Sequence, residues 1–193
     1  MQEETIVESP AIGTQKNTTR EPVALSHIQS EVVTRFESGL PEVDRVLGGG
    51  IVPGSFVLLG GDPGIGKSTL LLQIAAFASQ TGPVLYVTAE ESASQTRLRA
   101  KRLQTAGDNL FVLAEGDIHQ IVRTIISRKW RLAVVDSLQT VYNPDLESAP
   151  GSVGQVRDVA SRLMRVAKGE EGQACPVFLV GHVTKEGSLR PVA

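Results

Sequence analysis

The sequence predicts an α/β domain built on an open, mainly parallel sheet with helices on both faces. Short apolar segments alternate along the chain with longer segments of helical periodicity, which is the order that repeated strand–helix units produce. The apolar segments are nearly continuous, as expected of strands that are covered on both faces. A glycine-rich loop, GDPGIGKST, joins the first of these strands to the helix that follows it.

The composition is typical of a soluble globular protein and limits the possible functions. The 193 residues suit one α/β domain, with 41% hydrophobic and 21% charged residues. The net charge of -2 excludes an overall basic footprint but leaves room for a local DNA-binding face. A single cysteine, Cys175, offers neither an internal disulfide nor a zinc cluster, so we expect no zinc and a cytoplasmic location. No apolar run is long enough to span a membrane, and the acidic N-terminus is unlike a signal peptide.

The chain is predicted to begin with a flexible arm or linker over residues 1–34, which are polar and have no sustained period. The core is predicted over residues 35–193. It opens with a short helix that ends at the glycine run 48–50. The apolar residues that give this helix its spacing are Leu40, Val43, Val46 and Leu47.

Five strands and four further helices are predicted after this opening helix. The strands are expected at 55–60, 83–89, 109–114, 132–137 and 176–182, and the helices at 67–80, 92–104, 117–128 and 152–168. Their starts carry N-cap signals. Ser92 with Gln95 predicts a capping box, Asp117 predicts a single N-cap, and Ser152 with Gln155 predicts a second paired cap.

The loop at 61–69 matches the phosphate-binding pattern G-x-x-x-x-G-K-[ST], with a strand before it and a helix after it. Its glycines let backbone N–H groups turn toward phosphate oxygens, and the following helix adds the positive end of its dipole. We expect Lys67 to reach the β- and γ-phosphates of ATP and Ser68 to hold Mg²⁺. The alternative is a chance loop without a ligand. The expected nucleotide-binding residues are Gly61, Asp62, Pro63, Gly64, Ile65, Gly66, Lys67, Ser68 and Thr69.

Acidic residues end two of the other predicted strands. Asp136 follows an apolar run, and an acid there lies beside the phosphate loop of an open parallel sheet, where it can complete the Mg²⁺ shell. Its alternative role is to cap a turn. Glu90 and Glu91 end the second strand, and either carboxylate could polarise a water molecule. We assign this role to Glu90, which is nearer the strand, and leave Glu91 to favour the following helix dipole.

The fifth strand also ends in polar residues. His182 is expected to sense the γ-phosphate, with Thr184 and Lys185 at the same edge of the sheet, and the alternative is a solvated loop. The predicted catalytic residues are Lys67, Glu90, Asp136 and His182.

Five segments together resemble the RadA, or Sms, family of bacterial DNA repair proteins, whose ATPase core is RecA-like. They are RFESGLPEVDRVLGGGIVPGSFVLLGGDPGIGKSTLLLQIA, LYVTAEES, VVDSLQTVY, SAPGSVGQVRDVASRLMRVAK and FLVGHVTKEG, and they cover most of residues 35–187. The resemblance implies a RecA-like P-loop NTPase fold with strand order 3-2-4-5-1. It implies ATP hydrolysis coupled to single-stranded or branched DNA in recombinational repair, and hexameric rings. It also assigns the water-handling acid to Glu90 and the polar sensor to His182.

Two basic clusters are candidates for contact with DNA phosphates. Arg157, Arg165 and Lys168 share one face of the predicted helix at 152–168, and a solvated helix face is the alternative. For the second cluster we favour a solvated face. That cluster consists of Arg97, Arg99, Lys101 and Arg102.

The chain departs from the family pattern in three respects. The family's four-cysteine zinc module, its K-N-R-F-G motif and its Lon-protease-like domain are not present in this sequence. We therefore expect an ATPase core that is incomplete at its C-terminus, with the apolar first strand exposed at the edge of the sheet. Marginal stability or self-association would follow unless residues 1–50 cover that edge.

Two other functions fit the phosphate loop. One is a nucleotide-binding fragment that lacks the DNA-coupling and trans-acting elements needed for turnover. The other is a signalling ATPase of the KaiC type, against which the SAPGSVGQVR segment argues.

Overall fold

The computed structural model describes residues 22–27, 34–105 and 107–182 of the chain. The chain divides into two compact units, Met1–Val32 and Val33–Ala193. The described part of the first unit holds a single 3-10 helix, η1 (Leu25–His27), whose side chains are exposed. The second unit holds every other element described below. The predicted arm over residues 1–34 stays a prediction.

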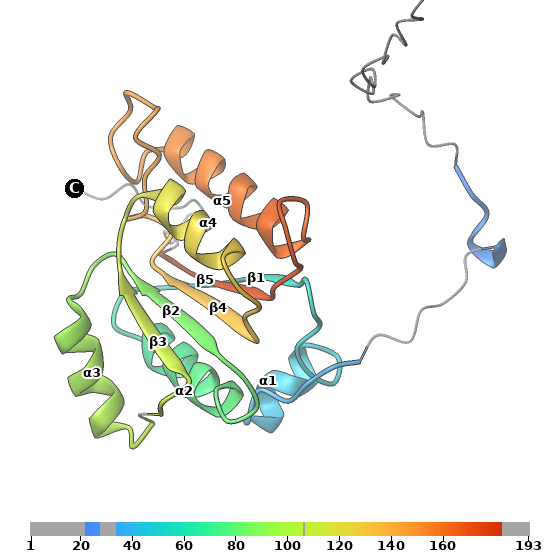
Figure 1. Ribbon diagram of the computed structural model, residues 1–193, viewed down its shortest axis with the longest axis horizontal. Coiled ribbons are helices and arrows are strands. Elements are labelled where there is room, and N and C mark those ends of the chain that lie inside the picture. Colours follow the sequence, from blue (N-terminus) through green and yellow to red (C-terminus); the bar gives the residue numbers. More distant parts are fainter. Residues whose placement is uncertain (1–21, 28–33, 106, 183–193) are drawn as a thin grey trace, which may run out of the picture. The chain divides into compact units, whose positions relative to one another are not determined.

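Five parallel strands form one sheet in the second unit, in the order β1-β5-β4-β2-β3 (Figure 1). The strands are β1 (Phe56–Gly61), β2 (Val84–Thr88), β3 (Leu110–Ala114), β4 (Leu132–Asp136) and β5 (Val177–His182). Read from the other edge, this is the predicted order 3-2-4-5-1. The predicted fold class, an α/β RecA-like P-loop domain, is confirmed.

Helices cover both faces of the sheet (Figure 1). On one face lie α2 (Lys67–Ala78) and α3 (Ala93–Arg102), with the short α1 (Pro41–Val46) beside α2. On the other lie α4 (Ile118–Ile126) and α5 (Val153–Ala167). The side chains of each strand alternate between two buried clusters: Val84 and Tyr86 of β2 pack toward α2, whereas Leu85 and Val87 pack toward α4 and α5.

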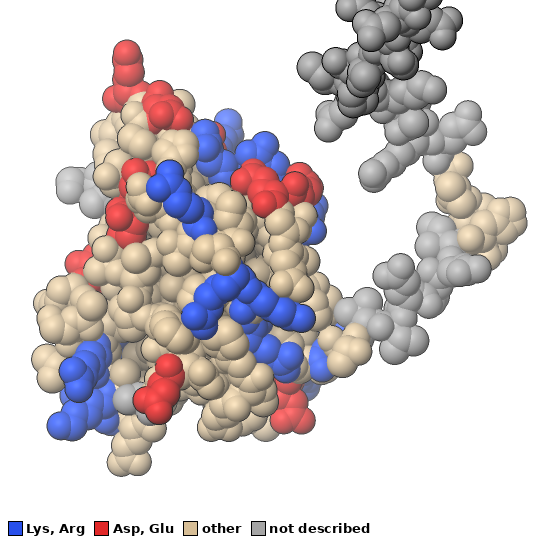
Figure 2. Space-filling view, in the orientation of Figure 1, with Lys and Arg blue, Asp and Glu red and all other residues tan. Residues whose placement is uncertain are grey.

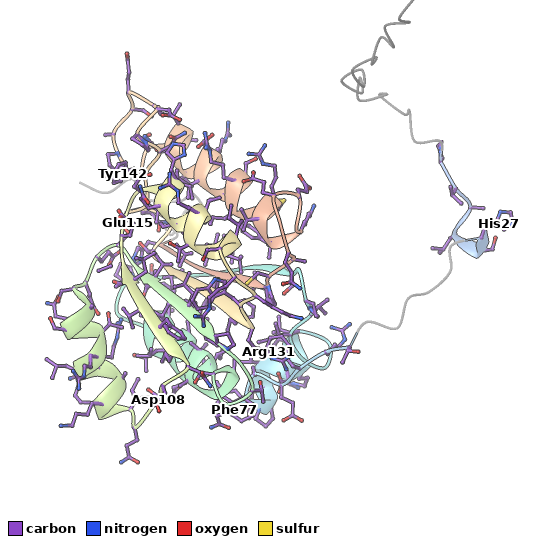
Figure 3. All side chains as sticks on the ribbon, in the orientation of Figure 1. His27, Phe77, Asp108, Glu115, Arg131 and Tyr142 are labelled. Atoms are coloured by element: carbon purple, nitrogen blue, oxygen red, sulfur yellow. The ribbon has the colours of Figure 1, made fainter. Side chains whose placement is uncertain are left out.

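Because the strands are parallel, the loops that follow them meet at one edge of the sheet. Figure 3 shows Glu115 and Tyr142, from the loops after β3 and β4, at this carboxyl edge. Arg131, which precedes β4, lies at the opposite edge with Phe77 near the end of α2 (Figure 3). The predicted nucleotide-binding and catalytic residues all belong to the carboxyl edge.

Two of the three predicted helix caps are confirmed. Ser92 and Gln95 form the reciprocal capping box of α3, and Asp117 accepts a hydrogen bond from the backbone N–H of His119 at the start of α4. The third prediction is half wrong. Ser152 accepts from the backbone N–H of Gln155, but the Gln155 side chain turns inward to the 143–148 loop because that loop offers it buried partners.

The first strand lies at an edge of the sheet, as predicted. Among the described strands, β1 pairs only with β5, and Leu58 at its centre is 47% exposed. The neighbouring β5 is buried almost throughout. The predicted marginal stability and self-association stay predictions.

Candidate functional site

The phosphate loop connects β1 to α2 and takes a backbone path that requires glycine. Gly64 and Gly66 have φ values of +82° and +100°, in the left-handed region that other residues rarely adopt. A Cβ atom at either position would meet no other atom within 4 Å. The need for glycine at both positions is therefore one of backbone conformation rather than of space.

This path leaves a row of backbone donors for a ligand. Within the described ranges, the backbone N–H groups of residues 64–69 donate to no acceptor. The Lys67 side chain is buried, and its Nζ donates to the backbone oxygens of Gly61 and Asp62, each at 2.7 Å. Two of its three N–H groups are thus used to shape the loop. Free donors, an ammonium group and a helix N-terminus together fit the phosphates of a nucleotide.

One tyrosine hydroxyl contacts both residues predicted to bind Mg²⁺, through the Asp136 carboxylate and the backbone oxygen of Ser68. Asp136 ends β4 next to Thr88 of β2 and is buried. Tyr86 donates a hydrogen bond of 2.6 Å to Asp136 Oδ2, and its hydroxyl lies 3.5 Å from the backbone oxygen of Ser68. A hydroxyl and a carboxylate are the hard oxygen ligands that Mg²⁺ prefers, so these residues fit the ion.

Tyr86 remains a hydrogen-bond donor in this environment. The side chain is fully buried. Burial, reinforced by the negative charge of Asp136, raises the pKa of Tyr86 above its ordinary value. The phenol therefore keeps its proton and can donate it to the Asp136 carboxylate.

The predicted water-handling acid and the predicted sensor are also neighbours. Glu90 Oε1 accepts a hydrogen bond of 2.5 Å from the Ser137 hydroxyl and lies 3.7 Å from Nε2 of His182. The register of β1 and β5 pairs His182 with Gly61, so the histidine lies beside the phosphate loop. Gln139 donates to the backbone oxygen of His182 and ties β5 to the loop after β4.

Glu91 points to a different partner. Its Oε2 lies 2.9 Å from Nη2 of Arg99 in an ion pair that lacks hydrogen-bond geometry. Arg99 Nη2 also lies 3.9 Å from Asp136 Oδ2, and its side chain is only 17% exposed. The solvated reading of the α3 basic cluster is therefore wrong for Arg99, because α3 packs it against the acids at the sheet edge. The other members, Arg97, Lys101 and Arg102, are exposed.

Sequence reasoning missed three polar side chains that contact the predicted site residues. Tyr86 is one of the apolar-looking residues of a strand, Ser137 follows the end of β4, and Arg99 lies inside a basic helix. Only Tyr86 could have been found from the sequence, because the alternation of side chains along β2 places it on the same face of the sheet as Asp136.

The predicted DNA-binding residues lie on the surface of α5 or at its end. Arg157, Arg165 and Lys168 are exposed, and Arg165 pairs with Glu171 at 3.2 Å. Figure 2 shows basic and acidic side chains interspersed over the visible face, with a group of basic side chains over α3. Thr184 and Lys185 lie outside the described residues. Within the described ranges, no helix has both the length and the apolar character needed to cross a membrane.

Comparison with known proteins gives one family match and several relatives. The family model described as AAA domain matches residues 20–188. The DNA repair protein RadA of Listeria monocytogenes is 53% identical over 177 residues, which are 90% of this chain. The RadA proteins of Bacillus subtilis and Escherichia coli are each 49% identical, over 89% and 86% of this chain. The chain spans little more than a third of these relatives, at 38%, 37% and 35% of their lengths. Its phosphate loop, its sheet order and this match together show that the chain belongs to the AAA domain family and is similar to part of the bacterial DNA repair protein RadA.

Proposed function

We propose that the chain is the ATP-binding, DNA-dependent ATPase core of a cytoplasmic recombinational repair protein that acts on branched DNA intermediates. One observation carries the nucleotide part: a loop with free N–H donors and the buried Lys67 lies at the same sheet edge as Asp136. The similarity to proteins named DNA repair protein RadA supports the DNA part.

The residues at the carboxyl edge of the sheet have separate roles in phosphoryl transfer. When bound, Mg²⁺·ATP supplies the γ-phosphate that water attacks. The free N–H groups of residues 64–69 and the Lys67 ammonium neutralise phosphate charge, which is the main protein contribution in this reaction class. Ser68 and Asp136 would hold the metal through oxygen atoms.

Glu90 and His182 complete the catalytic set. Glu90 has an exposed side chain at the carboxyl edge and orients the attacking water. His182 ends β5 beside Gly61, so a change at the γ-phosphate alters its contact with Glu90. Through the Gln139 hydrogen bond, the same change reaches the loop after β4. This loop leads into α5, which carries the basic residues proposed to bind DNA.

The proposed DNA contacts lie along one side of α5. From Arg157 to Lys168 a helical rise of 1.5 Å per residue gives a span of about 16 Å, enough to follow several phosphates of one strand. In a homo-oligomeric ring, which we propose for this core, α5 of each subunit would present its basic face to DNA. Replacing Arg157, Arg165 and Lys168 by Gln should reduce stimulation of turnover by DNA and flatten its salt dependence.

The test is steady-state ATP turnover with and without single-stranded DNA, with Lys67→Ala as the blank. The proposal expects turnover above the blank that rises when single-stranded or branched DNA is added. Turnover that ignores DNA would refute the DNA part. Turnover no higher than the blank, from wild-type protein with a cooperative thermal transition, would leave nucleotide binding without hydrolysis.

A further inference from the structure

A tyrosine and an arginine lie near the same oxygen of the Asp136 carboxylate, the predicted Mg²⁺ ligand. Tyr86 donates to Asp136 Oδ2 at 2.6 Å, and Arg99 Nη2 lies 3.9 Å from the same oxygen. In the described part of the chain, no donor reaches Asp136 Oδ1 within hydrogen-bond distance. The protein contacts are therefore all on one side of the carboxylate.

The two groups reach Asp136 from different elements of the same layer. Tyr86 lies in β2 next to Val134, two residues before the end of β4, so its long side chain extends along the sheet to the carboxylate. Arg99 comes from the last turn of α3 and is itself paired with Glu91 at 2.9 Å. Each partner is anchored independently of any ligand.

A buried carboxylate needs such partners. Asp136 is 6% exposed, and an unpaired charge at that depth would be strongly disfavoured. An arginine at 3.9 Å supplies a compensating charge, while a neutral phenol supplies a short directional bond. The phenol fixes the rotation of the carboxylate, because a bond to one oxygen determines where the other oxygen points.

We propose that Tyr86 and Arg99 are positioning residues that fix the Asp136 carboxylate through Oδ2 and leave Oδ1 for the magnesium shell. The inference rests on the proposed nucleotide-binding function. Neither residue touches the nucleotide in this account. Outer-shell partners of this kind typically change metal affinity or activity by 10- to 100-fold when they are removed.

The test measures how much Mg²⁺ is needed to bind a fluorescent ATP analogue, N-methylanthraniloyl-ATP. Tyr86→Phe removes only the hydroxyl, and we expect about a tenfold rise in the Mg²⁺ concentration for half-maximal binding. In excess EDTA, Tyr86→Phe and wild type should bind the analogue with the same affinity. Tyr142→Phe is the matched control, since Tyr142 is exposed at the same sheet edge (Figure 3).

Arg99→Gln is a second, independent variant for the case in which Tyr86→Phe does not fold. It should raise the Mg²⁺ requirement about tenfold, whereas Arg97→Gln, on the exposed side of the same helix, should not. A merely structural role would lower the melting temperature and leave the Mg²⁺ midpoint unchanged.

Three results separate the possibilities. A raised midpoint in Tyr86→Phe or in Arg99→Gln, with both controls unchanged, supports the inference. Wild-type midpoints in the folded variants overturn it while leaving the proposed function intact. If wild-type protein binds the analogue without any dependence on Mg²⁺ or does not bind it, the proposed function is refuted and the inference falls with it.

Discussion

Replacing the buried Gln155 should destabilise the protein through the loop that follows β4. Gln155 is 1% exposed and lies near the start of α5. Its Oε1 accepts from the backbone N–H of Asn143 at 2.7 Å, and its Nε2 donates to the backbone oxygens of Asn143 at 3.1 Å and Ser148 at 2.8 Å. Gln155→Met keeps much of the volume and removes these bonds together with a longer one, of 3.4 Å, from Nε2 to the backbone oxygen of Leu146.

The loss of stability depends on whether water can replace the Gln155 side chain at each backbone group that loses its hydrogen bond. Ser148 is exposed, so water can replace its lost partner. Asn143 is 1% exposed, and its N–H group would be left unpaired, whereas its carbonyl keeps the hydrogen bond from the Leu146 N–H at 3.2 Å. A buried polar group without a partner costs about 1–3 kcal/mol, so the single unpaired N–H of Asn143 gives an expected loss of about 1–3 kcal/mol.

Urea unfolding followed by far-UV circular dichroism measures this loss. Gln120→Met is the matched control, because Gln120 is exposed on α4 and should change stability by less than about 0.5 kcal/mol. If Gln155→Met unfolds within about 0.5 kcal/mol of wild type, the 143–148 loop is not held by this side chain and the reasoning is refuted.

Three further predictions follow from the same structure. Gly66→Ala forces an alanine into a strained φ of +100° and should weaken ATP binding about tenfold. Gly48→Ala, at φ +71° outside the phosphate loop, should leave the affinity for the same fluorescent analogue unchanged. Equal affinities of the two variants in this titration would contradict the prediction. Burial raises the pKa of Cys175 to about 12 from an unfolded value of 9.0, so the unfolded thiol ionises first and stability should fall from pH 9 to pH 12. Urea midpoints of Cys175→Ala should fall less steeply over that range, and an identical slope would contradict the assignment. Leu58→Lys should reduce self-association seen by light scattering, because it charges the exposed edge strand; a sharp monomeric wild-type peak with a high melting temperature would contradict the prediction.

The sequence predicted the elements and the edge of the sheet at which the site lies, because both depend on local patterns. Continuous apolar runs mark buried strands, and the residue after each run lies at the carboxyl edge. That rule was enough to place Asp136 and His182 at the edge of the phosphate loop, whereas the structure alone gives the register that sets Asp136 beside Thr88 and His182 beside Gly61. The strand order followed from the family resemblance rather than from local pattern.

The contacts within the site could not be predicted, because they join elements that are distant in the sequence. The Tyr86 hydroxyl reaches Asp136, 50 residues away, and Ser137 reaches Glu90, 47 residues away. Arg99 looked like one member of an exposed basic cluster, and only the packing of α3 shows that it faces the acids. Gln155 fitted a capping pattern, but buried partners in the 143–148 loop compete more strongly for its side chain.

Equilibrium binding of ATP in the presence of Mg²⁺, measured by calorimetry on wild type and Lys67→Ala, tests the central claim most directly. The account predicts saturable binding by wild type and a loss of at least about tenfold in Lys67→Ala, because a charge-assisted hydrogen bond to phosphate is removed. The thermal transition of the variant checks that it is folded. Equal affinity in the two folded proteins would contradict the assignment of residues 61–69 as the nucleotide site.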